Sequence, residues 1–422
     1  MSKLLNDEKN KNKYLSWKIQ NELIDIMASS TRNLICEDIK RSQWFSIIMD
    51  STLDITKTDQ VSIVIRYVIL DYETRNLTIE ESFLGFFCIQ EHGAKNYEQL
   101  ITNVILELGL DINMCRGQGD DGAAVIKGFY SGLRKRIKDK VPTASYIHYC
   151  AHNLNLVISD AVKSNQKVQF FFDTVQAVFN FFSSSAPRWT LAFGEGNASK
   201  IKQTVLKKWG ISKDYHEVHS KFAIRYFDEV DGDRILNVTT ENFKIRVFLP
   251  VIDTVIFQLS NRFNALKEIT ENFDFLQPIT LVNLSEDDLI KASYDFDQLY
   301  KNDITSDLTR QLLSVRELIN ISEVKNIEQL TLYILKHDYS TSYCDILSAT
   351  LIYLTLPVKV ASAERSFFKL KLIKNYLRNS MNQDRLSNIA ILNIEKNKTQ
   401  NLDINKIIDN FANIKVRKVN FS

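Results

Sequence analysis

The sequence predicts an α/β fold in which helices cover a mixed sheet and a long helical stretch follows. Two observations carry this prediction. Five short runs rich in β-branched and aromatic residues fall within the first 150 residues, and from the third run onward they alternate with amphipathic helical patterns. From about residue 165 to 340 only helical patterns appear. Helices packed on the faces of a sheet are the natural way to bury these apolar stripes.

The composition agrees with this class. In 422 residues, 45% hydrophobic side chains can fill two or three subdomains, and twelve glycines with five prolines favour helix over long disordered linkers. The net charge of +2 excludes a polycation, so nucleic-acid contacts must come from local patches. Five cysteines without a C-x-x-C pair indicate reduced thiols, and neither a signal peptide nor a membrane segment is visible. We expect a soluble intracellular protein.

The first elements are helices followed by three strands. Two helical patterns fill residues 13–43, and strand candidates follow at 44–50, 60–70 and 78–89. Because the links between these strands are short, we expect them to pair antiparallel.

Helices and strands then alternate. Asn96 caps an expected helix that Gly109 ends, and a short strand at 112–116 leads into a Gly-Asp-Asp-Gly turn. A helix from Ala123 to Pro142, a fifth strand at 144–150 and a further helix complete the order β-β-β-α-β-α-β-α.

The rest of the chain reads as helix. An aromatic stripe formed by Phe171, Val175, Val178 and Phe182 predicts a helical packing core. The last segment holds three helical candidates, at 342–355, 361–378 and 382–396.

Residues 116–128, "RGQGDDGAAVIKG", contain the G-x-G-x-x-G pattern of a dinucleotide site. Asp120 and Asp121 would set negative charge against a pyrophosphate, and Asp139, about 20 residues on, does not sit at a strand end. We therefore interpret the glycines as incidental and the aspartates as the better candidates.

Two acids follow predicted strands. Asp50 ends the first strand and Asp121 follows the fourth, so both carboxylates lie at one end of the sheet if these strands are neighbours. Such a pair suits a divalent ion, although a single Asp at a strand end is more often a cap or turn residue.

A third acid could come from residues 356–381. Glu364 begins a helix on which Phe368, Leu372 and Tyr376 are expected to fill one face. Lys371, Lys374 and Arg378 recur at i, i+3 and i+7, so we expect one basic stripe along the same helix. Cations beside a carboxylate suit a phosphodiester site, and the alternative is a solvated helix face.

These motifs resemble those of the hAT-superfamily transposases and their domesticated relatives, in the branch of the zinc finger MYM-type and TTF-type proteins. The stretches that carry the resemblance are "IIMDSTLDITKTDQVSIVIRYV", "GQGDDGAAVIKG", "YCAHNLNLVISDA", "ENFKIRVFLPVID" and "PVKVASAERSFFKLKLIKNYLRNSMNQDRLSNIAILNIEK". The last resembles the hAT C-terminal dimerisation region.

The resemblance implies a ribonuclease H-like mixed sheet that is interrupted by a mostly helical insertion and followed by a helical C-terminal segment. The implied layout is N-terminal helices over 1–43, the first part of the core over 44–164, a shortened insertion over 165–340 and a dimerisation region over 341–422. By motif, Asp50, Asp121 and Glu364 match the three metal-binding acids. The implied chemistry is cleavage and transfer of DNA strands with Mg²⁺ or Mn²⁺.

Several features depart from the family pattern. Ser51, Asp120 and Val125 replace its usual residues, and no zinc-finger module precedes the first strand. Trp209 is a candidate for the tryptophan that stacks on a flipped base, and Trp189 competes with it. A structural role is the alternative for both.

The family's Cys/His motif falls at Cys150 and His152, and with His148 it reads H-x-C-x-H. Side chains alternate along a strand and no second ligand pair is present, which favours packing or a site-lining role over zinc.

Two functions remain open. The first is a degenerate or domesticated transposase that self-associates through its C-terminal helices and is nucleic-acid associated. The second is an active metal-dependent transposase or nuclease. We expect a homodimer or higher oligomer, no membrane association, and the nuclear location that the family implies. We expect a set of apolar residues in the C-terminal segment to supply the dimer surface, and the alternative is that they pack inside one chain. These residues are Leu347, Leu351, Leu354, Leu386, Ile389, Ala390 and Ile394.

Overall fold

The computed structural model describes residues 16–89, 91, 93–120, 127–148, 150–193, 243–357 and 361–414. The chain divides into two compact units, one of residues 1–150 with 265–422 and one of residues 151–264. The domain layout expected from the family, with limits at 164 and 340, stays a prediction. No helix among the described residues combines the length and apolarity needed to cross a membrane.

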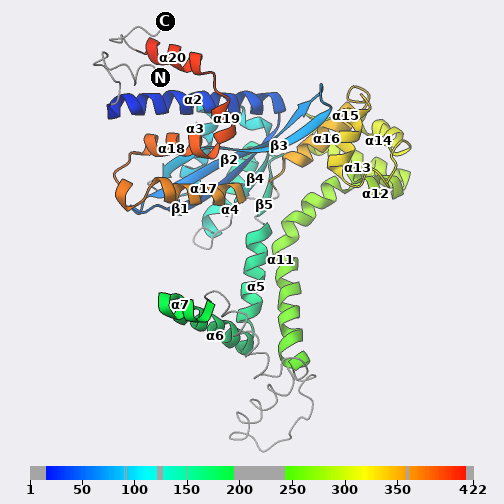
Figure 1. Cartoon of the computed structure of the whole chain (residues 1–422). Helices are drawn as coiled ribbons and strands as arrows, with labels where there is room; N and C mark the ends of the chain where they lie inside the picture. The colour runs from blue at the N-terminus through cyan, green and yellow to red at the C-terminus, as the bar shows by residue number, and fades with distance from the viewer. Residues whose placement is uncertain are drawn as a thin grey trace, which may run out of the picture. The chain divides into compact units, whose positions relative to one another are not determined.

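The first unit is built on the expected mixed sheet (Figure 1). Its strands are β1 (Phe45–Leu53), β2 (Asp59–Asp71), β3 (Asn76–Ile89), β4 (Cys115–Asp120) and β5 (Ser145–His148). Their order is β3-β2-β1-β4-β5, with β1, β2 and β3 antiparallel and with β4 parallel to both β1 and β5. The first and fourth strands are therefore neighbours.

Helices cover both faces of this sheet. Helices α2 (Trp17–Ser42), α3 (Ala94–Glu107) and α4 (Lys127–Lys140) pack on the face that carries Tyr67 and Gln118, and Gln118 Nε2 donates to the Arg134 carbonyl of α4. Helices α16 (Cys344–Thr355) and α17 (Ala361–Ile373) cover the other face, where Arg66 Nε donates to the Leu354 carbonyl at 3.1 Å.

A second hydrophobic cluster lies beside the sheet. It is formed by η4 (Asp274–Leu276), α12 (Pro278–Asn283), α13 (Glu286–Leu299), α14 (Leu308–Arg316), α15 (Ile327–Lys336), α16 and the end of α11 (Leu249–Phe273). Arg116 on β4 makes a two-pronged salt bridge to Asp303 at 2.6 and 2.9 Å, and both side chains are buried. Both hydrophobic clusters consist of residues of the first unit.

The C-terminal helices complete the sheet's core. They are α18 (Gln383–Ile394), α19 (Lys396–Gln400) and α20 (Ile404–Asn413). Leu386 and Ala390 are fully buried, and Leu347, Leu351 and Leu354 are less than 9% exposed. The prediction that the apolar set forms the dimer surface is wrong for these five residues, because they pack inside their own chain. The other two members, Ile389 and Ile394, are partly buried against the same core.

Side chains seal the outer edge of β3. The Phe83 N–H donates to Glu395 Oε1 at 2.6 Å, and the Phe86 N–H donates to Ser387 Oγ at 3.1 Å. Arg32 Nε donates to the Leu84 carbonyl at 3.1 Å. An edge strand whose backbone groups are occupied this way is a poor template for a further strand.

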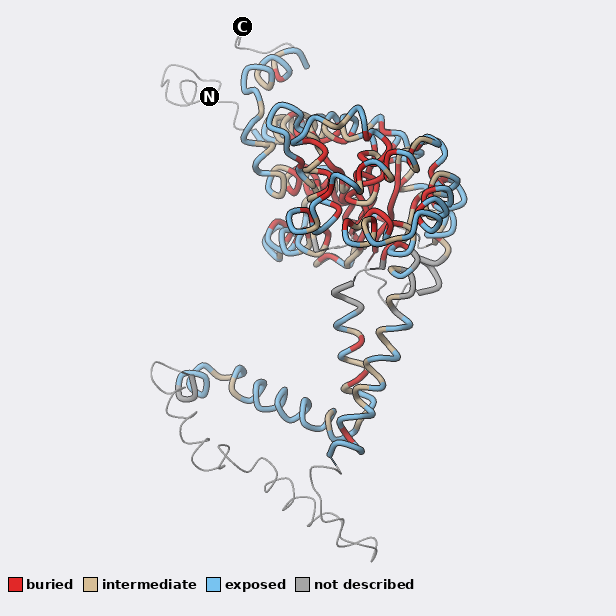
Figure 2. The backbone as a smooth tube through the Cα atoms, turned by 90° about the vertical axis from the view of Figure 1, so that its right-hand side faces the viewer, coloured by how far each residue is buried: buried red, intermediate tan, exposed pale blue. Residues whose placement is uncertain are grey.

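The second unit is described by α5 (Cys150–Lys163), α6 (Gln166–Ser183), α7 (Ala186–Phe193), η3 (Lys244–Phe248) and the first part of α11. Helix α6 buries none of its residues (Figure 2). Phe171, Val175 and Val178 are about half exposed. Among the described residues α6 packs on α7, and the predicted aromatic packing core is not formed there.

Three element boundaries differ from those predicted. Residues 17–42 form one continuous helix in place of two. Strand β4 runs through the glycine motif to Asp120. Helix α17 ends at Ile373, because the Asn375 side chain caps a separate short helix, η5 (Tyr376–Arg378).

Candidate functional site

Asp50 lies near the C-terminal end of β1, as predicted. Its side chain is 4% exposed, and its Oδ1 accepts the Ser51 N–H at 2.7 Å. Across the sheet it pairs with Ser62 of β2. Paired residues of neighbouring strands point to the same face, so the Asp50 carboxylate shares a face with the Ser62 hydroxyl.

Helix α17 brings Glu364 to this same face. The Ser366 hydroxyl donates a hydrogen bond to Ser62 Oγ at 2.8 Å, and the Ser362 hydroxyl donates one to the Glu81 carboxylate of β3. Glu364 lies two residues from both Ser362 and Ser366, about 200° around the helix from each, so its side chain leaves α17 on a different flank from these two contacts. Asp50 and the helix that carries Glu364 lie on one side of the sheet.

Asp120 belongs to the opposite side. The register pairs Ile48 with Gly119, and Asp120 is the next residue, so its side chain points away from the Asp50 face. There Tyr146 Oη donates to Asp120 Oδ1 at 2.9 Å. Asp120 is thus not a partner of Asp50.

The second expected acid, Asp121, lies outside the described residues. Among the residues that are described, no group of three His, Cys, Asp or Glu side chains has an arrangement that could hold a metal. The three-acid site accordingly stays a prediction. Trp209 and the side chains of His148, Cys150 and His152 also lie outside the described set.

The predicted basic stripe is wrong at Lys374. Its ammonium group is buried and donates to Asp54 Oδ2 at 2.6 Å and to Thr56 Oγ1 at 3.1 Å. Burial of Asp54 is outweighed by the hydrogen bonds from Lys374, Thr56 and Thr58, which lower the pKa of Asp54 to about 2. We call this group the Asp54 clasp. It ties the β1–β2 turn to the end of α17.

The other candidate cations, Lys371 and Arg378, lie on the surface. Their role as DNA contacts stays a prediction.

The apolar side chains of α17 are also reversed from the expected arrangement. Phe368 and Leu372 are about 70% exposed, and Tyr376 and Leu377 of η5 are more than 80% exposed. We call these four residues the α17 apolar patch. The inner face of α17 is formed by Ala363, Ser366, Leu370 and Ile373, and the buried Lys374 follows directly.

Gly117 has a packing role. A Cβ atom there would lie 2.4 Å from Ser46 Oγ and 2.7 Å from Pro357 Cδ. The glycine allows β4 to approach β1 and the end of α16, and this explains one member of the G-x-G-x-x-G pattern without a phosphate.

Sequence reasoning missed the Asp54 clasp. Asp54 follows Asp50 by four residues in the same motif, and a second acid beside a strand end was an available signal. Its partner Lys374 lies 320 residues away, and no local pattern links the two.

Two family models match the sequence. Residues 1–132 match the ZMYM1/FAM200 RNase-like domain, and residues 308–398 match the hAT family C-terminal dimerisation region. The first match contains β1–β4, and the second contains α14–α18 with the α17 apolar patch.

Two curated relatives share the name "52 kDa repressor of the inhibitor of the protein kinase". The human protein is 27% identical over 169 residues, which are 39% of this chain and 21% of that protein. The mouse protein is 25% identical over 212 residues, which are 47% of this chain and 27% of that protein. The chain thus matches about a quarter of the length of these relatives. Sheet order, family matches and relatives agree, and the chain belongs to the hAT transposase-derived proteins that join an RNase-like domain to a hAT dimerisation region.

Proposed function

We propose that this protein is a domesticated hAT transposase that self-associates through its C-terminal region and acts in the nucleus in association with nucleic acid. The observation that carries the self-association is the α17 apolar patch, which lies inside the segment that matches a dimerisation region. Exposed apolar patches of this kind mark protein interfaces. The occupant is a second copy of this chain.

The test of self-association is the mass of the full chain in solution. We expect a dimer or higher oligomer at micromolar concentration by sedimentation and light scattering. Replacing Phe368 and Leu372 by Asp should give a folded monomer, because each carboxylate would have to be desolvated in the interface.

Leu106→Asp is the matched control, since Leu106 is 73% exposed on α3, outside the dimerisation match. A monomeric wild-type chain would overturn the proposal. An oligomer that the double variant leaves intact would move the interface away from α17.

A regulatory role is favoured over a catalytic one by two points. The matched relatives are named as a repressor. The sequence also departs from the transposase pattern at Ser51, Asp120 and Val125, beside two of the three expected acids.

The second candidate function is metal-dependent cleavage of DNA. Its support is that α17, the helix that carries Glu364, packs on the face of the sheet that carries Asp50. Asp120 lies on the other face, which leaves Asp121 as the candidate for the second acid. Mg²⁺ or Mn²⁺ held by Asp50, Asp121 and Glu364 would activate the attacking oxygen and stabilise the leaving one.

Nicking of a supercoiled plasmid tests this alternative. Cleavage that needs Mg²⁺ or Mn²⁺ and disappears in Asp50→Asn and Asp121→Asn would establish it. Equal inactivity of the folded wild type and both variants would leave the regulatory role.

A further inference from the structure

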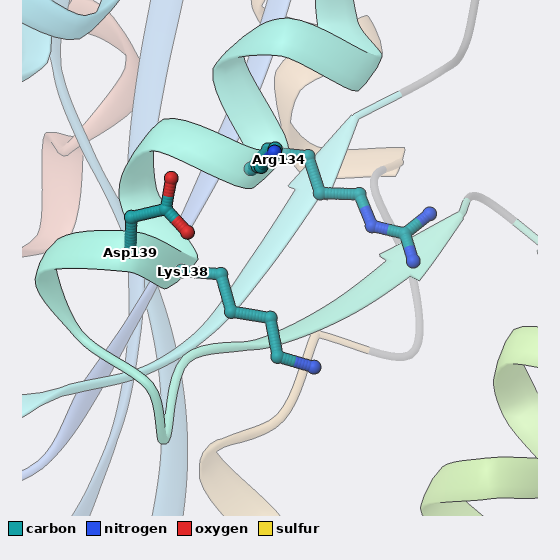
Figure 3. Close-up of a pocket in the computed structure, with 4 residues that line it drawn as sticks. Arg134, Lys138 and Asp139 are labelled. Atoms are coloured by element: carbon teal, nitrogen blue, oxygen red, sulfur yellow. The ribbon is translucent and has the colours of Figure 1, made fainter.

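One flank of α4 concentrates positive charge beside the end of the sheet. Residues Arg134–Lys140 contain five basic side chains and one acid, Asp139, whereas the whole chain carries only +2. Arg134, Lys135 and Lys138 are exposed and, with Asp139, line a groove of about 290 Å³. Figure 3 shows Arg134 and Lys138 extending to the same side of the helix, away from Asp139.

The other two cations of residues Arg134–Lys140 serve a different purpose. Arg136 and Lys140 both pair with Glu98 of α3, at 3.0 and 2.9 Å. They are one helical turn apart on the flank that faces α3, so they help to fix the two helices together. The charge that faces away from α3 is that of Arg134 and Lys138, a second pair one turn apart.

Tyr146 of β5 positions Arg134. The guanidinium carbon lies 4.4 Å from the centre of the Tyr146 ring, a cation–π contact that leaves the N–H groups at the edge of the guanidinium directed outward. The same tyrosine donates its hydroxyl to Asp120 at the end of β4. Tyr146 thus contacts Arg134 through its ring face and Asp120, at the carboxyl end of β4, through its hydroxyl.

This location is one strand away from the place where open α/β sheets bind ligands. β1 leads toward β2 and β3, whereas β4 leads toward β5, so the strand order switches direction between β1 and β4. Ligands bind outside the carboxyl ends of strands at such a switch point. Two cations one helical turn apart can bind successive anionic groups of an extended polymer, because the charges of such a polymer also recur at a regular spacing.

We propose that Arg134, Lys138 and Lys135 form a binding surface for the phosphodiester backbone of a nucleic acid, with Tyr146 as a positioning residue for Arg134. The inference rests on the proposed association with nucleic acid and names the surface that carries it. Recognition is by charge, so it holds for duplex and single-stranded probes and adds no base preference.

The test measures the binding of the full chain to a random-sequence DNA duplex of about 30 base pairs and to one strand of it, by fluorescence anisotropy between 50 and 200 mM salt. The Arg134→Gln, Lys138→Gln double variant should weaken duplex binding roughly tenfold at the lowest salt. It should also reduce the slope of log affinity against log salt by about 2, the value for two lost phosphate contacts.

The matched control is the Arg136→Gln, Lys140→Gln double variant, which removes the same charge from the same helix. Its affinity and salt slope should stay within about twofold and 0.5 of the wild type. Circular dichroism confirms that both variants are folded.

Each other result overturns a distinct claim. If the wild type binds neither probe, the association with nucleic acid fails and this surface fails with it. The wild type could bind while the Arg134→Gln, Lys138→Gln variant binds with the same affinity, or while both double variants lose the same affinity. Either result would refute the assignment of binding to this flank of α4 and leave the association with nucleic acid standing. Tighter binding of polyglutamate than of DNA at equal charge would replace the nucleic acid by an acidic protein.

Discussion

Lys374 is a buried cation directly after α17, a helix whose own lysines are exposed. Its ammonium group and the Asp54 carboxylate form the Asp54 clasp, with side-chain exposures of 7% and 1%. Removing one partner of a buried pair leaves the other charge without compensation. We therefore expect Lys374→Met to lower the free energy of unfolding by about 3 kcal/mol, whereas Lys371→Met on the exposed face should change it by less than about 0.5 kcal/mol.

The clasp also gives the protein an acid-dependent stability. The pKa of Asp54 is about 2 in the folded chain and 3.8 ordinarily, so the folded state prefers the ionised form. Its contribution is present above pH 4 and is lost as the pH falls toward 2. Chemical denaturation at pH 4 and pH 2 should show the wild type losing about 2 kcal/mol more than Lys374→Met. Equal losses in the two proteins would contradict the role of the clasp.

At the residue scale the sequence predicted positions better than partners. Asp50 could be placed because a short apolar run ends beside it and short links force its neighbours to pair. The pairing of Asp54 with Lys374 could not be foreseen, because a lysine at a helical position looks the same whether it meets water or a carboxylate.

The sealed edge of β3 depends on a carboxyl group with a raised pKa, that of Glu395. Glu395 follows α18. Burial raises the pKa of its carboxyl group to about 7, and the hydrogen bond from the Phe83 N–H offsets this rise only in part. The folded state therefore holds the proton more tightly than the unfolded state. This contribution to stability is full below pH 4.5 and is lost as the pH rises through 7.

Glu395→Gln should remove this dependence, because the amide oxygen can still accept the Phe83 N–H. We expect the variant to match the wild type near pH 5 and to be more stable by about 1–3 kcal/mol at pH 8. The control is Glu107→Gln, at an exposed position of α3. If the free energies of unfolding of Glu395→Gln and of the wild type changed in parallel from pH 5 to 8, ionisation of the Glu395 carboxyl group would not destabilise the folded state.

The strands themselves were predictable from their apolar runs, and four of the five were placed within a few residues of their observed positions. The fourth was misplaced, because its glycines read as a turn. Gly117 is in fact extended and tightly packed against Ser46 and Pro357. A glycine that is needed for close approach gives the same local signal as one that is needed for a turn.

The whole molecule is a sheet-based unit into which residues 151–264 are inserted. As far as the structure describes residues 151–264, none of them belongs to either hydrophobic cluster of the first unit. Replacing residues 151–264 with a flexible linker of about ten Gly and Ser residues should therefore leave the first unit folded.

Calorimetry of this shortened chain should retain a cooperative transition within a few degrees of the corresponding wild-type transition. A control deletion of residues 344–394, which contribute to both clusters, should abolish it. Loss of the transition in the shortened chain would mean that the second unit stabilises the first.

At this scale the sequence identified the family and the need for a dimer surface but not the surface itself. Amphipathic periodicity shows which side chains are apolar, and it does not show whether the covering partner is the same chain or another. Leu386 and Phe368 are equally apolar in the sequence, yet one is fully buried and the other is 70% exposed.

The strands of the sheet are synthesised long before the helices that cover one of its faces, and this order matters while the chain is still on the ribosome. The last strand is complete at His148, but α16 begins only at Cys344 and α18 ends at Ile394. At roughly 5–20 residues per second, the nascent chain presents a sheet with one uncovered face for on the order of ten to fifty seconds. During that interval Ile48 and its neighbours are open to chaperones and to other nascent chains, so a copy cut short before residue 344 would never hide them.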